Sequence, residues 1–319
     1  MRRKVIQIAD STLLVSMPKK WADANNVKKG DEVQVTPSEN SLLITLDSKP
    51  QIEIAYVNNL EDFGSMARRY LHALYKKGID EIHVTFKRPM ALTEIQDGLS
   101  FRNSAVGYEI VEQSTNHCVI KNVGGQPGEF NMLLRRVFLL MSTMSKEGFT
   151  ALKVGNIESL KHAAELERSN NRLTTICRRY INKKGQLNYS HIGPLYHIVE
   201  ELEALADEYK YLFVYLANFD KKSLKLSPQF YTLYEEVDKM WTRFSSVFYK
   251  FDAKQIAEIS ETRKSLVDQC IKMMEDSKNK QEIIACNHLF VIVQRIFNMV
   301  SPYLVIAETL NLNSSEVRH

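Results

Sequence analysis

LYHIVEELEALADEYKYLFVYLA, residues 195–217, predicts one long amphipathic helix. Its apolar residues recur at steps of three and four, the period of a single helix face: Ile198, Leu202, Leu205, Tyr209 and Leu212. Glu203 and Asp207 lie beside this face, and their spacing of four residues puts the two carboxylates one turn apart. Like charges in this arrangement repel by about 0.2–0.5 kcal/mol in an isolated helix, so either water or a bound group is expected between them.

Two interpretations of this acidic pair are open. Glu200, Glu201 and Glu208 are also acidic, so the cluster can be the solvated flank of a bundle helix, which is the usual place of Glu and Asp. A second pair favours a binding site instead. The segment AAELERSNNRLTTI, residues 163–176, places Glu167 and Asn171 at the same spacing of four.

The composition is that of an ordinary soluble protein: 44% of the 319 residues are hydrophobic, 25% are charged, and the formal net charge is +4. This length allows about two domains, or three small ones. The mild positive charge does not by itself indicate a nucleic-acid partner. The first residues lack the apolar run of a signal peptide, and no uninterrupted apolar segment of about 18 residues occurs, so we expect no membrane insertion.

Four cysteines are scattered along the chain: Cys118, Cys177, Cys270 and Cys286. They form neither a CxxC motif nor a zinc-type Cys/His spacing. Isolated thiols are typical of a reducing compartment, where disulfides do not persist. The sequence therefore favours a cytoplasmic protein.

Residues 1–46 predict two short hairpins around a short helix. The expected strands are residues 5–8, 13–16, 32–36 and 42–46, with turns at residues 10–11 and 37–40 and a helix at residues 19–25. Hairpins this short cannot bury enough apolar surface alone. We therefore expect a homodimer in which a second copy completes the N-terminal domain.

The same residues resemble a known family. RKVIQIADSTLLVSMPKKWADANNVKKGDEVQVTPSENSLLITL, residues 3–46, is similar to a SpoVT/AbrB swapped-hairpin domain, and the match is carried by VSMP at residues 15–18 and VKKGDEVQV at residues 27–35. In that family two chains interleave their hairpins into one barrel, and basic side chains on one face bind DNA. The resemblance implies a dimeric swapped-hairpin β-barrel over residues 1–48.

The basic residues expected to contact DNA are Arg2, Arg3, Lys4, Lys19 and Lys20. Through residue 46, seven basic residues stand against five acidic ones, a net charge of +2. Thr12 stands where the family has an arginine, and Ala22 and Asp23 stand where it has an arginine pair. A dimerisation module that binds no DNA is therefore the alternative.

Residues 50–125 predict a small α/β domain. The expected order is strand, helix, strand, helix, strand, strand, which places helices on one face of a sheet: strands at residues 52–56, 81–86, 108–113 and 117–123, and helices at residues 60–77 and 93–100. No phosphate-binding glycine pattern occurs in this segment. The sequence assigns it no function.

The remaining residues predict an all-α pair of three-helix bundles, residues 130–218 and 228–312. The expected helices are residues 130–146, 157–182 and 194–218 in the first bundle, and 228–251, 252–274 and 280–311 in the second. The second bundle repeats the first. Glu203 and Asp207 correspond to Gln294 and Asn298, and Glu167 and Asn171 correspond to Glu261 and Ser265.

This duplicated layout resembles the PhoU family of phosphate-uptake regulators. The match is carried by ELEALADEY at residues 201–209 and QRIFNMVSPYLVIAE at residues 294–308, within a similarity that spans residues 130–312. The resemblance implies a role in phosphate homeostasis. A SpoVT/AbrB-like front joined to a PhoU-like rear is typical of archaea.

In the PhoU family, acidic and amide pairs from two helices of one bundle bind clustered iron or zinc ions. Carried over to this chain, the resemblance implies a metal site of Glu167, Asn171, Glu203 and Asp207, with iron, zinc or another divalent cation. Oxygen ligands suit hard cations, which also remove the repulsion between the acids. The second bundle retains only Glu261 as an acid, so we expect no tight metal binding there and interpret it as a packing or partner surface.

Catalysis has little support, because no Ser or Cys with an activating His is visible. The chain is therefore expected to be no enzyme. It is interpreted as a dimeric DNA-binding transcriptional regulator linked to phosphate uptake. The alternative is an adaptor that binds no DNA and regulates a phosphate-transporter ATPase or a sensor kinase through protein contacts. A di-iron type enzyme is the weakest interpretation, because the Glu-x-x-His pairs of those bundles are missing.

Overall fold

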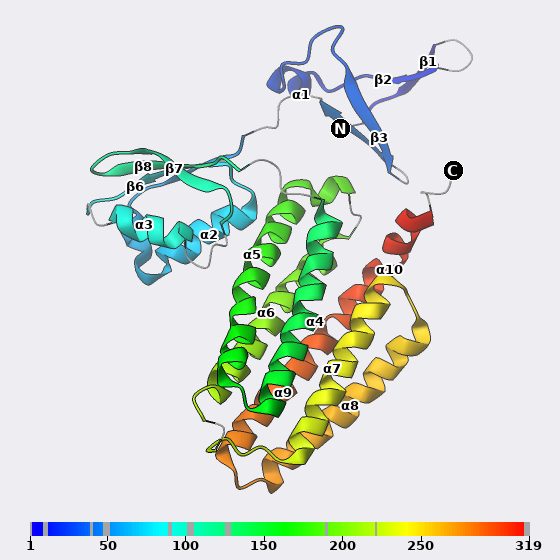
Figure 1. The fold of residues 1–319 in the computed structure, drawn as a ribbon. Coiled ribbons are helices and arrows are strands. Elements are labelled where there is room, and N and C mark those ends of the chain that lie inside the picture. Colours follow the sequence, from blue (N-terminus) through cyan, green and yellow to red (C-terminus); the bar gives the residue numbers. More distant parts are fainter. Residues whose placement is uncertain are drawn as a thin grey trace. The chain divides into compact units, whose positions relative to one another are not determined.

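The structure is a computed structural model that describes residues 2–8, 12–38, 41–46, 52–88, 91–100, 105–124, 129–188, 191–220 and 222–315. The chain divides into two compact units, Met1–Gln51 and Ile52–His319 (Figure 1). The second unit has two separate hydrophobic cores, one between Val57 and Ile120 and one between Phe130 and Ala307. These parts are called the N-terminal unit (residues 1–51), the α/β region (residues 52–124) and the helical region (residues 129–315).

The N-terminal unit contains two antiparallel hairpins with a short helix between them: β1 (Val5–Ile8), β2 (Thr12–Val15), α1 (Lys19–Ala24), β3 (Val33–Ser38) and β4 (Ser41–Leu46). In the first hairpin Val5 lies opposite Val15, and in the second Val33 lies opposite Leu46. The predicted order of elements is confirmed. β3 continues through Pro37 to Ser38, so the second turn begins later than predicted, and residues 9–11 and 39–40 lie outside the described residues.

The apolar side chains of these hairpins face solvent in the single chain. Among the described side chains of the N-terminal unit, none is buried, and the most exposed apolar ones lie on β1, β2 and β4: Val5, Ile6, Ile8, Leu13, Val15 and Leu42. The described strands form two separate two-stranded sheets, and neither is closed. The predicted barrel requires strands from a second chain, so the barrel stays a prediction.

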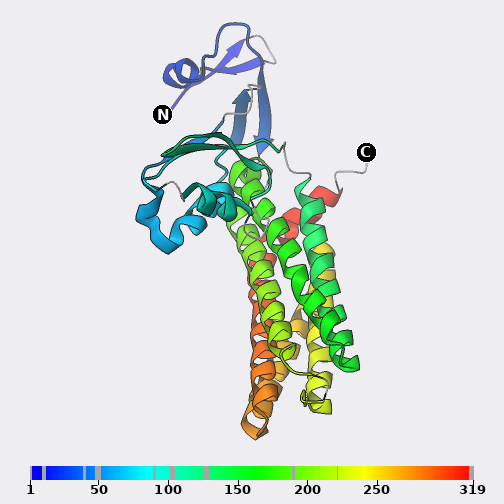
Figure 2. The same ribbon diagram turned by 60° about the vertical axis from the view of Figure 1, so that its left-hand side comes forward.

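The α/β region is a four-stranded sheet covered by helices on one face (Figures 1 and 2). Its elements are β5 (Ile54–Val57), η1 (Leu60–Met66), α2 (Ala67–Lys77), β6 (Glu81–Thr85), α3 (Ala91–Ser100), β7 (Tyr108–Gln113) and β8 (His117–Asn122). The strand order is β5-β6-β8-β7, with β5 parallel to β6 and the other pairs antiparallel. Ile82, Val84 and Ile120 of the sheet are fully buried in one core with Leu71 and Leu74 of α2.

The helix predicted at residues 60–77 is divided. Its first part is the 3-10 helix η1, which contains Gly64 at φ +48, and α2 follows from Ala67. A positive φ is accessible to glycine at little cost, and it interrupts a regular α-helix. Gly78, also at positive φ, follows Lys77 and ends α2 at the predicted boundary of the helix.

The helical region begins with α4 (Phe130–Val154), α5 (Ile157–Asn188) and α6 (Ile192–Leu216). These three helices pack side by side (Figures 1 and 2). The apolar face predicted on α6 is confirmed, since Ile198, Leu202, Leu205, Tyr209 and Leu212 are all 0% exposed. α4 approaches α6 closely at Gly148, where a Cβ atom would overlap the ring of Phe213.

A second set follows: α7 (Pro228–Tyr249), α8 (Ala253–Asp276), α9 (Lys280–Asn298) and α10 (Val300–Ser315). The side chains of Ser227, Asp252 and Asn279 cap α7, α8 and α9, each accepting a backbone N–H of the first turn. α6 packs against α9, and α4 packs against α7. The two sets, predicted as separate bundles, therefore share one continuous hydrophobic core.

The last predicted helix, residues 280–311, is divided into α9 and α10 at Met299. Pro302 has no N–H to donate to the carbonyl of Asn298 one turn earlier, which accounts for the interruption. Residues Lys280–Ala307 are the single segment in the described part of the chain that is long and apolar enough to cross a membrane. Several of its apolar side chains, among them Leu289, Ile292 and Val293, are fully buried in the shared core, and such a core helix passes the same test of length and composition.

Candidate functional site

A cluster of buried and partly buried charged side chains lies between α5 and α6. We call it the α5–α6 ion cluster and define it by the residues Glu167, Asn171, Arg178, Glu200, Glu203, Asp207 and Lys210. It contains all four predicted metal ligands, with Glu167 and Asn171 on α5 and Glu203 and Asp207 on α6. The two predicted pairs thus lie on two helices that pack against each other.

Lys210 joins the two pairs. Its Nζ lies 2.9 Å from Glu167 Oε1 and 2.5 Å from Asp207 Oδ1, so one ammonium bridges a carboxylate of α5 and a carboxylate of α6. Asn171 Nδ2 donates a hydrogen bond to the same Oε1 of Glu167 at 2.5 Å. Burial lowers the pKa of Lys210, but its hydrogen bonds to Asp207 and Glu167 raise the pKa by more, so it lies above the usual value.

Arg178 supplies the second cation of the cluster. Its guanidinium is almost completely buried and is paired with Glu200, at 2.5 Å from Nη1 to Oε1, and with Glu203. Thr174 Oγ1 also donates to Glu203 Oε2 at 3.0 Å. Arginine suits this position because its planar group can donate to several acceptors at once.

These contacts test whether the cluster fits a metal ion. Asn171 Oδ1 is buried without a hydrogen-bond partner, which would suit a ligand atom. Glu167 and Asp207, however, already share the Lys210 ammonium, and a metal ion between them would have to displace it. Nowhere in the described residues do three or more His, Cys, Asp or Glu side chains gather in a way that could hold a metal ion. The side chains as placed do not fit a metal, and the metal site stays a prediction.

Three of the four corresponding positions of the second set are neutral. Gln294 accepts hydrogen bonds from Arg263, at 2.9 Å from Nη2 and 3.3 Å from Nε. Ser265 accepts from Gln269 at 3.1 Å. Glu261 is exposed. This set therefore satisfies its polar groups with ordinary neutral and charge-assisted hydrogen bonds.

Sequence reasoning missed Lys210 and Arg178. Both lie at helical spacing from predicted site residues, since Lys210 is three residues after Asp207 and Arg178 is seven after Asn171. Residues at these spacings share a helix face. Searching each acidic pair for a basic residue one or two turns away would have found both cations.

A second buried arginine joins the helical region to the α/β region. Arg179 Nη1 donates to the carbonyls of Tyr75 and Ile79, at 2.8 and 2.6 Å, and its Nη2 lies 2.7 Å from Asp80 Oδ1. Lys183 Nζ also binds both oxygens of Asp80. Arg178 and Arg179 are adjacent on α5. Arg178 pairs with carboxylates of the ion cluster, and Arg179 binds the α/β region.

The five residues predicted to contact DNA all belong to the N-terminal unit. Arg2, Arg3 and Lys4 precede β1, and Lys19 and Lys20 form the first turn of α1. All five side chains are exposed. They are accessible to a polyanion in the single chain.

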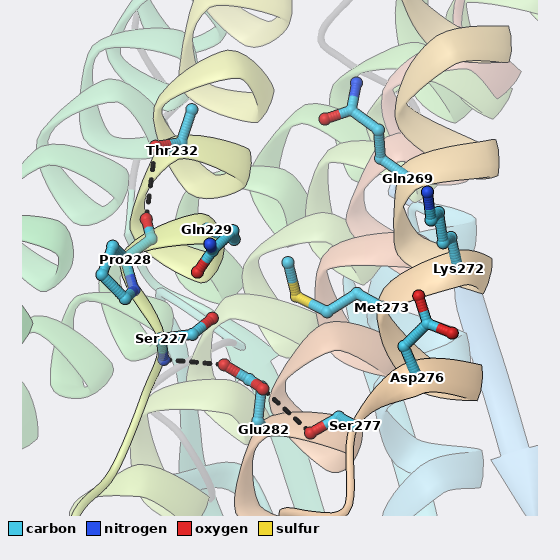
Figure 3. Close-up of a pocket in the computed structure, with 10 residues that line it drawn as sticks. All are labelled: Ser227, Pro228, Gln229, Thr232, Gln269, Lys272, Met273, Asp276, Ser277 and Glu282. Atoms are coloured by element: carbon cyan, nitrogen blue, oxygen red, sulfur yellow. Dashed lines mark hydrogen bonds between the residues drawn. The ribbon is translucent and has the colours of Figure 1, made fainter.

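A pocket of about 650 Å³ lies in the second set, between the start of α7 and the end of α8. Figure 3 shows Ser227, Pro228 and Thr232 on one side and Lys272, Met273 and Asp276 on the other. Glu282 closes it by accepting from the backbone N–H of Ser227 at 2.7 Å and from the Ser277 hydroxyl at 2.9 Å. Its lining charges, Lys272 against Asp276 and Glu282, favour no ligand class.

The cysteines lie inside the fold. All four are free and buried. Burial raises the pKa of Cys118 to about 11 and that of Cys177 to about 12, so these two thiols are protonated at neutral pH. Neither is an activated nucleophile.

Comparison with known proteins shows a partial similarity to a solved structure. No family model matches the chain, and no curated protein matches it. Among solved structures, the crystal structure of the phosphate transport system regulatory protein PhoU from Streptococcus pneumoniae matches with a TM-score of 0.45 and 14% sequence identity. The match covers 56% of this chain and 93% of that one. At this identity and score, the similarity assigns no activity to the chain.

Proposed function

We propose that this protein is a dimeric DNA-binding regulator linked to phosphate uptake, in which the helical region senses or relays phosphate status. The proposal rests mainly on the duplicated three-helix layout. The first family motif lies on α6, and the second spans the end of α9 and the start of α10; α6 packs against both of these helices inside one core. The duplication therefore brings the two motifs together in space. The free cysteines support a place in the cytoplasm.

The open hairpins support the dimer. Leu13 is 67% exposed and Leu42 is 66% exposed, and fully burying a leucine contributes about 1.5–3 kcal/mol. A second copy of the chain supplies the matching apolar surface, because its hairpins carry the same side chains. We propose that the two copies interleave β1–β2 and β3–β4 into one barrel.

The exposed basic side chains support DNA binding by this dimer. A two-fold arrangement presents Arg2, Arg3, Lys4, Lys19 and Lys20 twice, at a fixed separation, as dimeric DNA-binding proteins do. Lysine and arginine contacts to phosphates position a protein on the duplex, whereas base contacts select the sequence. A partner or effector on the helical region would change the separation of the two faces or cover one of them.

Binding to duplex DNA across a range of salt concentrations tests the proposal. The logarithm of the binding constant should fall linearly with the logarithm of the salt concentration, with a slope of about −0.9 for each phosphate contact. Replacing the five residues with alanine should flatten that slope and weaken binding. Lys28→Ala/Lys29→Ala is the matched control, because it removes exposed lysines of the same unit outside the predicted contact set. Salt-independent binding, or equal loss in the control, contradicts the DNA proposal.

The alternative, a protein adaptor without DNA binding, is favoured by the charge of the N-terminal unit. Its net charge through residue 46 is only +2, and Thr12, Ala22 and Asp23 replace expected arginines. In this version the hairpins only form the dimer, and the helical region docks on a phosphate-transporter ATPase or a sensor kinase. Pull-down of such a partner, together with no binding to any duplex at low salt, supports the adaptor over the regulator.

A further inference from the structure

The α5–α6 ion cluster contains its own cations. We infer that Lys210 and Arg178 take the role of a bound metal cation in the first three-helix set, so that this set stays folded without a metal ion. The inference does not depend on the regulatory function proposed above. Its failure and the failure of that function are therefore separable.

The position of Lys210 is that of a bridging cation. The ammonium lies between Glu167 of α5 and Asp207 of α6, at 2.9 and 2.5 Å, and so ties the two helices together through charge. The Glu167 side chain is only 4% exposed, whereas that of Asp207 is 26% exposed. Glu167 is thus the carboxylate that water reaches least, and Lys210 is the cation that compensates it.

Arg178 likewise pairs with the carboxylates at the other end of the cluster. Its side chain is 2% exposed, and it pairs with Glu200 and Glu203 of α6 while remaining part of α5. Its Nε also donates to the carbonyl of Thr174 at 3.3 Å. Each cation therefore links α5 to α6. The cluster has more carboxylates than cations, and the remaining negative charge lies on the carboxylates that are partly exposed to solvent.

An exposed lysine–glutamate ion pair in the helical region provides a comparison. Lys239 and Glu236 of α7 also lie three residues apart, with 2.7 Å between Nζ and Oε1, but their side chains are 66% and 41% exposed. Such surface pairs contribute little, because both groups are hydrated when they separate. If Lys210 acts as a bridging cation, its loss must have an effect that the loss of Lys239 lacks.

The test measures metal content and thermal unfolding of the full chain. Wild type, Lys210→Met, the milder Lys210→Gln and the control Lys239→Met are each analysed for bound metals after purification. Their Tm values are then recorded in EDTA and in excess Mn²⁺, an ion that carboxylates and amides bind well. We expect wild type and Lys239→Met to hold less than one metal per chain and to unfold at the same Tm in both solutions.

The two Lys210 variants should behave differently. In EDTA we expect their Tm to lie about 10 °C below that of wild type, because the buried carboxylate of Glu167 loses the ammonium that neutralises its charge. In Mn²⁺ much of that loss should be recovered, since the ion can take the place of the ammonium. A third variant, Lys210→Met/Asp207→Asn, should recover less, because one of the two carboxylates is no longer charged.

Three results would overturn the inference. The first is wild-type protein that carries one or more metal ions per chain and loses stability in EDTA. The second is Lys210 variants as stable as wild type in EDTA. The third is Lys210 variants that gain no more from Mn²⁺ than Lys239→Met does.

Discussion

Apolar side chains have opposite environments in the N-terminal unit and in the helical region. Leu13 of β2 is 67% exposed, whereas Leu202 of α6 is 0% exposed. None of the described side chains of the N-terminal unit is buried, while the helical region has one core that extends from Phe130 to Ala307. Both regions are rich in apolar residues, so composition does not separate them. Length and pairing do, because two short hairpins have no third layer to cover them.

The difference shows which part of the chain is complete by itself. The helical region buries its apolar residues and pairs Lys210 and Arg178 with its own carboxylates, while Arg179 pairs with Asp80 of the α/β region in the same compact unit. The apolar residues of the N-terminal unit are exposed and available for contact with another surface. We therefore interpret the helical region as self-contained and the N-terminal unit as half of an intermolecular fold.

The largest expected effect tests the self-contained helical region. Arg178→Met should lower the free energy of unfolding of this region by about 3 kcal/mol, because it leaves Glu203 and Glu200 without their buried partner. Arg263→Met, which removes the half-buried arginine beside neutral Gln294, should cost about 1 kcal/mol. Chemical denaturation followed by circular dichroism measures both. Equal losses would mean that the α5–α6 ion cluster contributes no more than an ordinary hydrogen bond.

The second prediction concerns the exposed hairpins. Leu13→Asp places a charge on the apolar surface that a second copy is expected to cover, so the dimer dissociation constant should rise by roughly 100-fold, about 2.7 kcal/mol. Leu139→Asp is the control, because Leu139 of α4 is 60% exposed but belongs to the self-contained region. Sedimentation equilibrium of both variants gives the constants. A dimer weakened equally by the two changes would move the interface away from the hairpins.

The smallest effect is a difference in pH dependence between the two helix sets. The pKa of Lys210 is raised above its usual 10.5, so its contribution to stability is complete below pH 10.5 and is lost as the pH rises through the folded-state pKa. The pKa of Glu282 is lowered from 4.5, because hydrogen bonds from Ser227 and Ser277 outweigh the opposing effect of burial. Its contribution is complete above pH 4.5 and is lost as the pH falls through the folded-state pKa.

Two variants separate these contributions. Lys210→Met should reduce the loss of Tm at alkaline pH, and Glu282→Gln should reduce the loss at acid pH without changing the alkaline limb. Thermal unfolding of wild type and both variants across the pH range measures the two limbs. Parallel profiles for all three proteins would show that neither pair contributes to folding.

Much of this fold could be predicted from the sequence, because its elements are strongly periodic. The three-and-four spacing of Ile198, Leu202 and Leu205 identified the buried face of α6, and the spacing of Glu167 and Asn171 identified the helix that faces it. The strand order of the N-terminal unit followed from its turn residues. These sequence patterns are local, and local patterns predict the folded structure when tertiary packing favours the same conformation.

The remaining features depend on contacts between distant residues. Lys210 meets Glu167 across 43 positions, and Arg179 meets Asp80 across 99, so no window of sequence contains either pair. The shared core of the two helix sets has the same origin, because the apolar residues of α6 and α9 are equally suited to separate bundles. The division of the predicted helix at residues 60–77 depends on the positive φ of Gly64. Glycine can adopt this conformation but is not restricted to it, so the sequence does not predict it.

Sedimentation velocity of the full chain at micromolar concentration tests the central claim most directly, namely that the N-terminal hairpins are completed by a second copy. We expect a species of twice the chain mass of 36.8 kDa, and we expect Leu13→Asp to dissociate it. A single species of one chain mass, with the hairpins nevertheless folded by circular dichroism, would contradict it.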